Sequence, residues 1–245
     1  MIYRRLLKNG LHWVVAISLG AAMAASNAAE QGQGVKDSQG GKPVSVRPAV
    51  IYKPLMYDAP LAKVDESTQG MDGKAAILQV LAPDHTGLTL QAQPTLFWHA
   101  RTPMVTRFEI ALLDKNKTDP LLKVESGSKK VAGIQQLDLG DHNISLKPEI
   151  SYQWSVTQVI DEGSQSSGII ASGVIERVEP GEGLKSRIKK SHGTELVSIY
   201  AIEGIWYDAL ETISSMIDKT PEDKGLVAIR ASLLEQVGLH AATGN

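Results

Sequence analysis

Four carboxylates are the residues of this 245-residue chain whose types and spacing best suit catalysis. Asp138 and Asp141 lie three residues apart, and Asp161 and Glu162 are adjacent. Two carboxylates held about 5–10 Å apart across a cleft can hydrolyse a glycosidic bond, one of them acting as the acid and the other as base or nucleophile. A carboxylate-dependent hydrolase or carbohydrate-active enzyme is therefore one functional hypothesis.

The potential metal ligands are not spaced as in calcium loops or zinc-binding motifs. Asp138-x-x-Asp141-x-Asn143 offers oxygen donors but lacks the glycine and the distal glutamate of a calcium loop, so a turn with side-chain-to-backbone hydrogen bonds is the better interpretation. The histidines beyond residue 28 have no ligand spacing and no His-Glu-x-x-His motif; they are His85, His99, His142, His192 and His240. Nucleophile-elbow, Walker and dinucleotide-binding motifs are absent. We assign no catalytic residue, metal or cofactor.

Aromatic residues occur in pairs in a chain that is only 5% aromatic. Such rings are usually core anchors, although a ligand platform is the alternative, and the predicted anchors are Trp98, Tyr152 and Trp154. Trp206 and Tyr207 are adjacent on an expected helix, about 100° apart, so one of them can edge outward. With Asp208, expected to face solvent or to pair with a base, they form the candidate interaction surface: Trp206, Tyr207 and Asp208.

Two further charged groups need an interpretation. Glu176 and Arg177 lie late in an expected strand, where an exposed cross-strand ion pair is usual, and a buried Arg177–Asp208 pair joining strands to helices is a more specific hypothesis. The basic segment from Lys185 to Lys190 is expected to be a solvated connector. Contact with an anionic envelope surface is its alternative role.

The N-terminus has the pattern of an export signal. Arg4, Arg5 and Lys8 precede an apolar run that ends in Ser26-Asn27-Ala28, which predicts a signal peptide over residues 1–28. An uncleaved anchor is the alternative, but it needs about 20 strongly apolar residues. We expect a periplasmic or secreted protein with no transmembrane segment after cleavage.

Charge and cysteine content narrow the partners. Without its first 28 residues the chain has 22 basic residues, the total of 25 less three, against 27 acidic ones. A mildly acidic protein repels phosphate backbones, so no nucleic acid is expected as a partner. Because the chain has no cysteine, hydrophobic packing must hold the fold without disulfides.

The elements that would position these residues fall into three segments. Residues 29–74 are expected to be a flexible tether containing proline and glycine, with an extended strip between Val46 and Leu61 that lies on the body. Residues 75–180 are expected to form an antiparallel β-sandwich like that of immunoglobulin or fibronectin domains. Its expected strands are Ile77–Leu81, Leu88–Ala92, Leu96–Trp98, Phe108–Leu112, Leu121–Val124, Ile134–Leu139, Tyr152–Val156 and Ile169–Val178. Leu146-x-Pro148-x-x-x-Tyr152 predicts a tyrosine corner.

Residues 181–245 are expected to form a hairpin of two helices. One apolar stripe runs from Leu196 to Ile217 and a second from Leu226 to Val237, with a cap predicted at Thr220. Gly204 to Leu210, with Pro221 beyond, is similar to half of a tetratricopeptide unit. A solenoid needs at least three units, so a hairpin docked on the sandwich or on a neighbouring protein is expected.

Three blocks resemble an uncharacterised bacterial family known as domain of unknown function 928. They are Leu81-Ala-Pro83-x-x-x-Gly87 to Leu90 with Pro94 to Trp98; Leu146-x-Pro148 with Tyr152-x-Trp154; and Gly173 to Val178 with Gly204 to Leu210. The resemblance covers about residues 75–240. It implies an exported protein of unestablished function from a cyanobacterium or a similar Gram-negative bacterium. Thr68 to Gly73 lacks the arginine that relatives often carry there.

The leading functional hypothesis is an exported, non-enzymatic interaction module with an envelope or secreted protein as partner. It depends on the absence of catalytic, metal and cofactor motifs and on the presence of a tether and a repeat-like hairpin. The hydrolase is the first alternative. A structural surface or envelope subunit, which would show an exposed unpaired edge strand, is the second. No oligomeric state is predicted.

Overall fold

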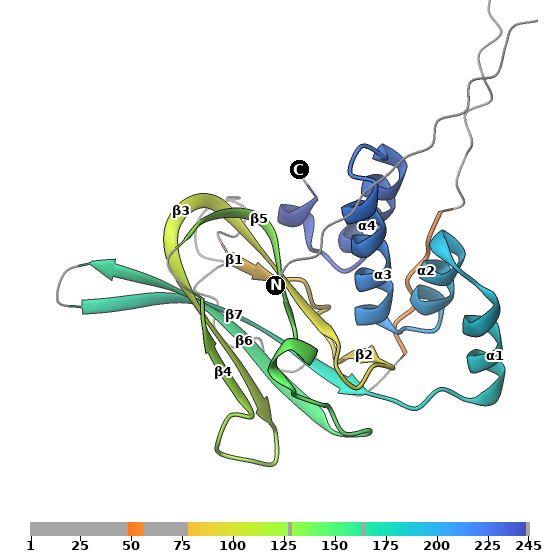
Figure 1. Ribbon diagram of the computed structural model, residues 1–245, viewed down its shortest axis with the longest axis horizontal. Helices are drawn as coiled ribbons and strands as arrows, with labels where there is room; N and C mark the ends of the chain where they lie inside the picture. Colours follow the sequence, from red (N-terminus) through yellow and green to blue (C-terminus); the bar gives the residue numbers. More distant parts are fainter. Residues whose placement is uncertain (1–48, 56–77, 127–128, 163–164, 244–245) are drawn as a thin grey trace, which may run out of the picture. The chain divides into compact units, whose positions relative to one another are not determined.

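The computed structural model describes residues 49–55, 78–126, 129–162 and 165–243 (Figure 1). Of these, the side chains at 102–106, 129–131 and 160–167 are not described. The predicted signal peptide and most of the predicted tether lie outside these residues. The described residues all belong to one compact unit, and all contacts below are within it.

The described strands form two sheets that share one long strand. The strands are β1 (Leu78–Val80), β2 (Gly87–Thr89), β3 (Thr95–Asp114), β4 (Leu122–Glu125), β5 (Lys129–Asp138), β6 (Ser151–Glu162) and β7 (Gln165–Arg177). The first half of β3 pairs with β1 and β5, which gives a sheet of three strands. Its second half pairs with β4 and β6, and β7 and β2 complete a sheet of five. Strand β3 thus belongs to both sheets, and with the helices described below the fold is mixed α/β.

Strand β3 merges two expected strands. The segments at Leu96–Trp98 and Phe108–Leu112 are parts of a single strand, with a register shift against β5 between Ala100 and Met104. Pro103, inside the shift, has no amide hydrogen to donate, and a bulge is where a strand tolerates proline. The break that the sequence suggests is therefore a bulge within one strand.

The expected sandwich is antiparallel, whereas the described sheets include a parallel pair. Strand β2 pairs with β7 in parallel, and an isolated parallel bridge joins Pro148 to Arg177. Leu88 lies opposite Glu176 in the β2–β7 register. This parallel pairing brings the end of β2 to the end of β7, beside the helices (Figure 1).

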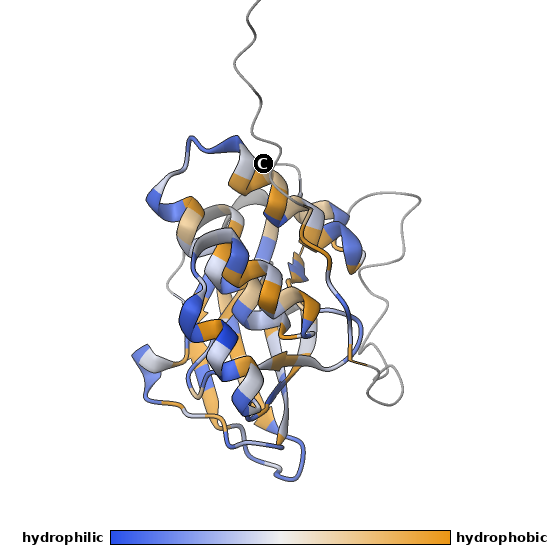
Figure 2. Cartoon of the chain, turned by 90° about the vertical axis from the view of Figure 1, so that its right-hand side faces the viewer, coloured by the Kyte–Doolittle hydropathy of each residue, from blue (hydrophilic) through white to orange (hydrophobic). Residues whose placement is uncertain are grey.

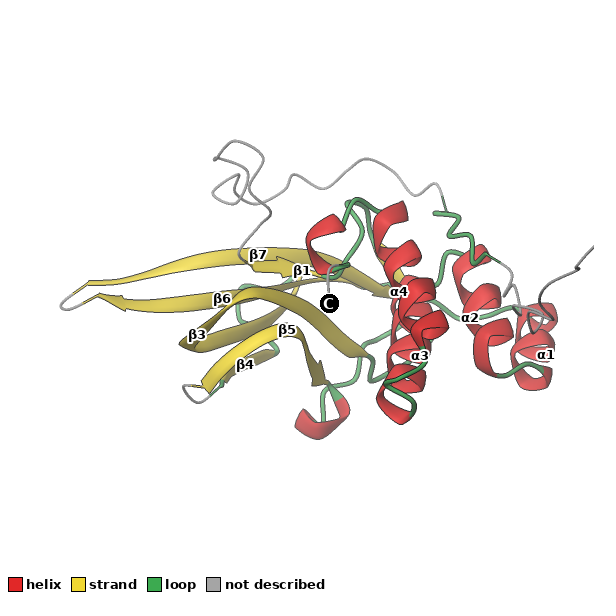
Figure 3. Ribbon diagram, turned by 90° about the horizontal axis from the view of Figure 1, so that it is seen from above, coloured by secondary structure: helices red, strands yellow, loops and turns green. Residues whose placement is uncertain are grey.

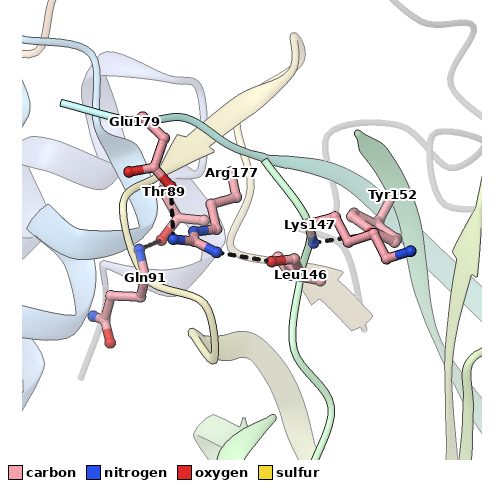
Figure 4. Close-up of polar contacts among 7 residues, drawn as sticks. All are labelled: Thr89, Gln91, Leu146, Lys147, Tyr152, Arg177 and Glu179. Atoms are coloured by element: carbon pink, nitrogen blue, oxygen red, sulfur yellow. Dashed lines mark hydrogen bonds and ion pairs between the residues drawn. The ribbon is translucent and has the colours of Figure 1, made fainter. Parts of the chain in front are cut away.

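The predicted tyrosine corner is confirmed. The Lys147 backbone N–H donates to the Tyr152 hydroxyl at 3.1 Å (Figure 4). Tyr152, Trp154 and Val156 alternate along β6 with exposed fractions of 2%, 0% and 0%. Tyr152, Trp154 and Val156 therefore face the core, as the pattern predicts.

Four helices follow the strands, and not the two that were expected. They are α1 (Glu182–Lys190), α2 (Gly193–Ile202), α3 (Trp206–Lys219) and α4 (Lys224–Gln236). Helix α1 occupies the segment expected to be a connector, and Lys185 pairs there with Glu182 at 2.8 Å. The predicted cap at Thr220 is three residues early, because the Asp223 carboxylate accepts from the backbone N–H groups of Gly225 and Leu226 at the start of α4.

The apolar stripe from Leu196 to Ile217 is divided between α2 and α3 by a glycine turn. Gly204 has φ +70°, and the Ile205 N–H donates to the Tyr200 carbonyl at 2.8 Å. The Gly204 N–H donates to the Ala201 carbonyl at 3.2 Å. These two bonds form the Schellman motif that ends a helix. The motif favours glycine at position 204, because the residue there must adopt a positive φ. The helical period continues in α3, but along a new axis.

Seen from above, the helices gather beyond one end of the strands, and the β6–β7 hairpin extends away from them (Figure 3). Helix α3 contacts β2 and β3. The helices carry both apolar and polar residues along their length (Figure 2). No helix among the described residues is long and apolar enough to cross a membrane.

Candidate functional site

The first turn of α3 is joined to the sheets by its polar atoms. The Trp206 indole N–H donates to the Leu81 carbonyl at 2.9 Å. The Trp154 indole N–H donates to the Tyr207 hydroxyl at 2.8 Å, and that hydroxyl donates to the Val174 carbonyl at 3.1 Å. Three buried aromatic residues thereby have their polar groups satisfied without solvent.

Tyr207 lies directly against β2. A Cβ atom placed on Gly87 would be 2.6 Å from Cε2 of the Tyr207 ring. Any larger residue at position 87 would therefore push the ring away from the sheet. Burial raises the pKa of the Tyr207 hydroxyl, which keeps that hydroxyl neutral and able to donate.

Asp208 is a buried carboxyl group held by the end of β2. Its Oδ2 accepts from Thr89 Oγ1 at 2.7 Å and from the Leu90 backbone N–H at 3.1 Å, and only 2% of the residue is exposed. Burial raises the pKa of Asp208 to about 7, against the lowering effect of these hydrogen bonds. The nearby charge of Glu211 raises it further. Asp208 can therefore exchange a proton near neutral pH.

Glu211, one turn later on α3, extends the same contact. Its carboxylate accepts from the Gln91 side-chain amide at 2.6 Å and from the Thr95 hydroxyl at 3.2 Å. Burial is the main cause that raises the pKa of Glu211. Both carboxyl groups are hydrogen-bonded to the sheets, so their main effect is to fix α3 in place.

The candidate interaction surface formed by Trp206, Tyr207 and Asp208 needs a correction. Trp206 and Tyr207 are both 0% exposed, and Asp208 is 2% exposed. The expectation that one of the aromatic residues edges outward is wrong, because α3 is covered by the sheets on one side and by α2 and α4 on others. All three side chains are covered, so none of them forms the open interaction surface that was expected.

The hypothetical Arg177–Asp208 pair does not form, and neither Glu176 nor Arg177 forms the expected ion pair across strands. Arg177 donates to the Leu146 carbonyl at 3.2 Å and forms an ion pair with Glu179 at 2.7 Å (Figure 4). Glu176 accepts from the Ser151 hydroxyl. Arg177 thus ties the end of β7 to the chain just before the tyrosine corner.

The other predicted residues are located as follows. The aromatic anchors Trp98, Tyr152 and Trp154 are 5%, 2% and 0% exposed. Asp138 accepts from the Gly140 backbone N–H at 2.7 Å, the turn expected from its spacing. Asp141 is exposed, and the side chains of Asp161 and Glu162 lie outside the described residues. In the described part of the chain, no three histidine or acidic residues gather in a way that would hold a metal ion.

A short extended segment on the helices is the second component of the site. We call residues 49–55 the strap. Gln236 at the end of α4 holds its backbone with both amide atoms: Oε1 accepts from the Tyr52 N–H at 2.8 Å, and Nε2 donates to the Val50 carbonyl at 3.0 Å. The Lys53 N–H donates to the Ala201 carbonyl of α2 at 3.0 Å. These bonds do not depend on the side chains of the strap.

Two side chains of the strap are buried, Val50 at 3% and Tyr52 at 7% exposure. The Tyr52 ring packs edge-on against Trp206, with centroids 5.0 Å apart, and stacks on His85 at 5.9 Å. Its hydroxyl lies 2.9 Å from His85 Nε2. Burial, with the charge of Asp84, raises the pKa of Tyr52. We call the receiving surface the strap groove; it consists of His85, Ala201, Gly204, Trp206 and Gln236.

The sequence indicates the strap but not the groove. Prolines around alternating apolar residues predict an extended strip, and Val50 and Tyr52 are its inward residues. Gln236 lies 184 residues from Tyr52, and no local pattern marks it as a backbone clamp. His85 is one of several scattered histidines, so its contact with Tyr52 also had no signal.

Comparison with known families gives one match. The family model described as Domain of Unknown Function (DUF928) matches residues 65–245, which is more than half of the chain. The chain belongs to the DUF928 family. No curated protein matches it. All residues of the strap groove lie within the DUF928 match, whereas the strap at residues 49–55 precedes it. The receiving surface is thus part of the family region, and its occupant is not.

Helix α4 also ends in a Schellman motif, in which the Gly238 N–H donates to the Glu235 carbonyl at 3.0 Å and the Leu239 N–H to the Leu234 carbonyl at 2.9 Å. The two Schellman glycines therefore provide a matched test of the strap contact. Gly204 and Gly238 have φ of +70° and +77°, but a Cβ on Gly204 would lie 2.9 Å from the Lys53 carbonyl oxygen, whereas one on Gly238 meets nothing within 4 Å. Gly238→Ala should therefore cost only the backbone strain, about 1–2 kcal/mol of unfolding free energy. Gly204→Ala should cost at least about 1 kcal/mol more in urea denaturation, because it also displaces the strap. Equal losses would contradict the contact.

Proposed function

We propose that this protein is an exported, non-enzymatic interaction module that binds extended segments of protein chain in the strap groove. The observation that carries the proposal is the recognition of the strap by Gln236, whose amide holds one backbone acceptor and one backbone donor two residues apart. Backbone hydrogen bonds provide affinity in such a mode, and pockets for alternate side chains provide specificity.

The chemistry of the groove defines the segment that it suits. The burial of Val50 and the aromatic contact of Tyr52 favour a segment with an apolar residue and a tyrosine two positions apart. The residue between them can be of any type. The His85 nitrogen near the Tyr52 hydroxyl favours tyrosine over phenylalanine, because phenylalanine would leave this partly buried ring nitrogen without its hydrogen-bond partner.

The rigid support beneath the groove favours binding over catalysis. Trp206 forms the floor under Tyr52, and its indole N–H is fixed to the Leu81 carbonyl. The polar groups of Tyr207 and Asp208 are likewise used to hold α3 against the sheets. A site built on fixed secondary structure is preorganised for a ligand, which reduces the entropy lost on binding.

Export follows from the N-terminal pattern of residues 1–28, and it makes an envelope or secreted protein the natural partner. Fractionation of the native host should then recover the protein in the periplasm or the medium, shortened by its first 28 residues. Recovery in the cytoplasm at full length would contradict export.

A peptide titration tests the groove. In the full chain, Val50→Ala with Tyr52→Ala should loosen the strap and leave the groove intact. A peptide of residues 47–56 should then bind, followed through tryptophan fluorescence, since Trp206 contacts the tyrosine ring. Adding Gln236→Ala removes two hydrogen bonds and should weaken binding about tenfold.

Two controls complete this test. A peptide in which alanine replaces the tyrosine should bind at least tenfold more weakly than the parent peptide. Glu235→Ala, at the exposed neighbour of Gln236, should leave the affinity unchanged. No binding by the loosened variant, or equal binding by both peptides, would overturn the proposed function.

A further inference from the structure

We infer, on the basis of the proposed function, that the strap groove also accepts the strap of a second copy of this chain, so that two copies can exchange straps. The partner is then chemically defined: an extended segment in which an apolar residue and a tyrosine are two positions apart. The groove holds such a segment from its own chain.

The contacts that hold the strap can form equally well between two copies. They comprise the two Gln236 bonds, the Lys53 bond to Ala201 and the burial of Val50 and Tyr52. None of them depends on the strap being continuous with the groove. Exchange of an identical element keeps every contact, which is why swapping is a low-cost route to a dimer.

Chain length does not confine the strap to its own groove. Residues 56–77 separate it from β1, a connection of 22 residues (77 less 55). At 3.3–3.6 Å per residue, such a connection can span up to roughly 75 Å. The strap also lies outside the residues matched by the family model.

Exposed apolar side chains at the strap favour a second copy over a short free peptide as the occupant. The large apolar residues exposed in the described part of the chain are Ile51 at 54%, Leu55 at 46%, Ile170 at 43% and Ile202 at 41%. Three of these four lie on the strap or beside Ala201, to which the strap is bonded. A neighbouring copy brought to this place would cover an apolar surface that a monomer leaves in water.

Concentration decides between the closed and the exchanged form. A tethered segment of this kind has an effective concentration of about 1 mM at its own groove. Exchange should therefore be minor at about 10 µM and substantial at about 1 mM.

Cysteine cross-linking of the full chain can detect exchange, because the natural sequence has no cysteine. One chain carries Lys53→Cys and another carries Ile202→Cys, both at exposed positions that the Lys53–Ala201 bond brings close. After equilibration of the mixture and addition of a short bismaleimide, a covalent heterodimer should form at about 1 mM and decrease at least tenfold at about 10 µM. The doubly substituted chain should give an internal cross-link at about 10 µM.

Two variants test whether the heterodimer arises through the groove. Tyr52→Ala in the strap-labelled chain, or Gln236→Ala in the groove-labelled chain, should reduce the heterodimer at least tenfold. No heterodimer at about 1 mM would overturn the exchange, and so would a heterodimer that both variants leave unchanged. A positive peptide titration with no heterodimer would leave the proposed function standing and remove only this inference.

Discussion

Replacing Asp208 with asparagine is expected to remove most of the pH dependence of the unfolding free energy between about pH 4 and pH 7. Burial raises the pKa of Asp208 from 3.8 to about 7 in the folded protein. The folded state therefore binds the proton more tightly than the unfolded state. The resulting stability is fully present below about pH 4 and is lost as the pH rises through about 7.

The size of this effect should be large for a single group. A rise of the Asp208 pKa by about three corresponds to a change of roughly 4 kcal/mol in the unfolding free energy. Asparagine keeps an oxygen that can accept from Thr89 and Leu90, but it does not ionise. Urea denaturation of the wild type from pH 4 to pH 8 should show this decline, and Asp208→Asn should show a much flatter profile.

Two further variants test which other groups contribute to the change of unfolding free energy with pH. Because burial also raises the pKa of Glu211, Glu211→Gln should reduce the slope in the same direction. Asp141→Asn, at an exposed carboxylate, should leave the profile as it is in the wild type. A profile for Asp208→Asn as steep as that of the wild type would contradict a buried, proton-binding Asp208.

Trp206→Ala is expected to destabilise the protein more than any other single truncation in α3. It removes a ring that is 0% exposed, leaves the Leu81 carbonyl without its donor and takes away the floor beneath Tyr52. Loss of a buried tryptophan costs about 3–5 kcal/mol. For a unit of this size the melting temperature should fall by roughly 10 °C in a thermal scan.

Matched variants separate the causes. Trp206→Phe keeps an aromatic ring and loses the hydrogen bond, so it should cost about 1–3 kcal/mol. Ile202→Ala, at a side chain that is 41% exposed, should cost less than about 0.5 kcal/mol. If Trp206→Ala lowers the unfolding free energy no more than Ile202→Ala, then Trp206 does not support the site.

Local features of the fold could be predicted from the sequence, and long-range pairings could not. The tyrosine corner joins residues five positions apart, so the pattern around Tyr152 is enough to predict it. The alternation in β6 likewise specifies its inward face. The parallel pairing of Gly87–Thr89 with β7 joins segments about 90 residues apart, and short strands carry no signal for their partner.

In the candidate site, too, local features could be predicted from the sequence and long-range contacts could not. The helical period correctly predicts an apolar stripe along α2 and α3, but it cannot show that other elements cover α3 on several sides. Asp208 looks like a solvent-facing acid because its partner Thr89 lies 119 residues away. The glycine at position 204 indicates a turn only when its positive φ is known, and for that reason one helix was expected where α2 and α3 exist. The other unexpected helix, α1, lies in the segment expected to be a connector.

Strand β3 belongs to both sheets, and this has a mechanical consequence. Because its two halves belong to one continuous strand, opening of either sheet should disturb the hydrogen bonds of the other. The amide hydrogens of β5 and β6, which flank its opposite halves, should accordingly exchange with solvent in a single cooperative event.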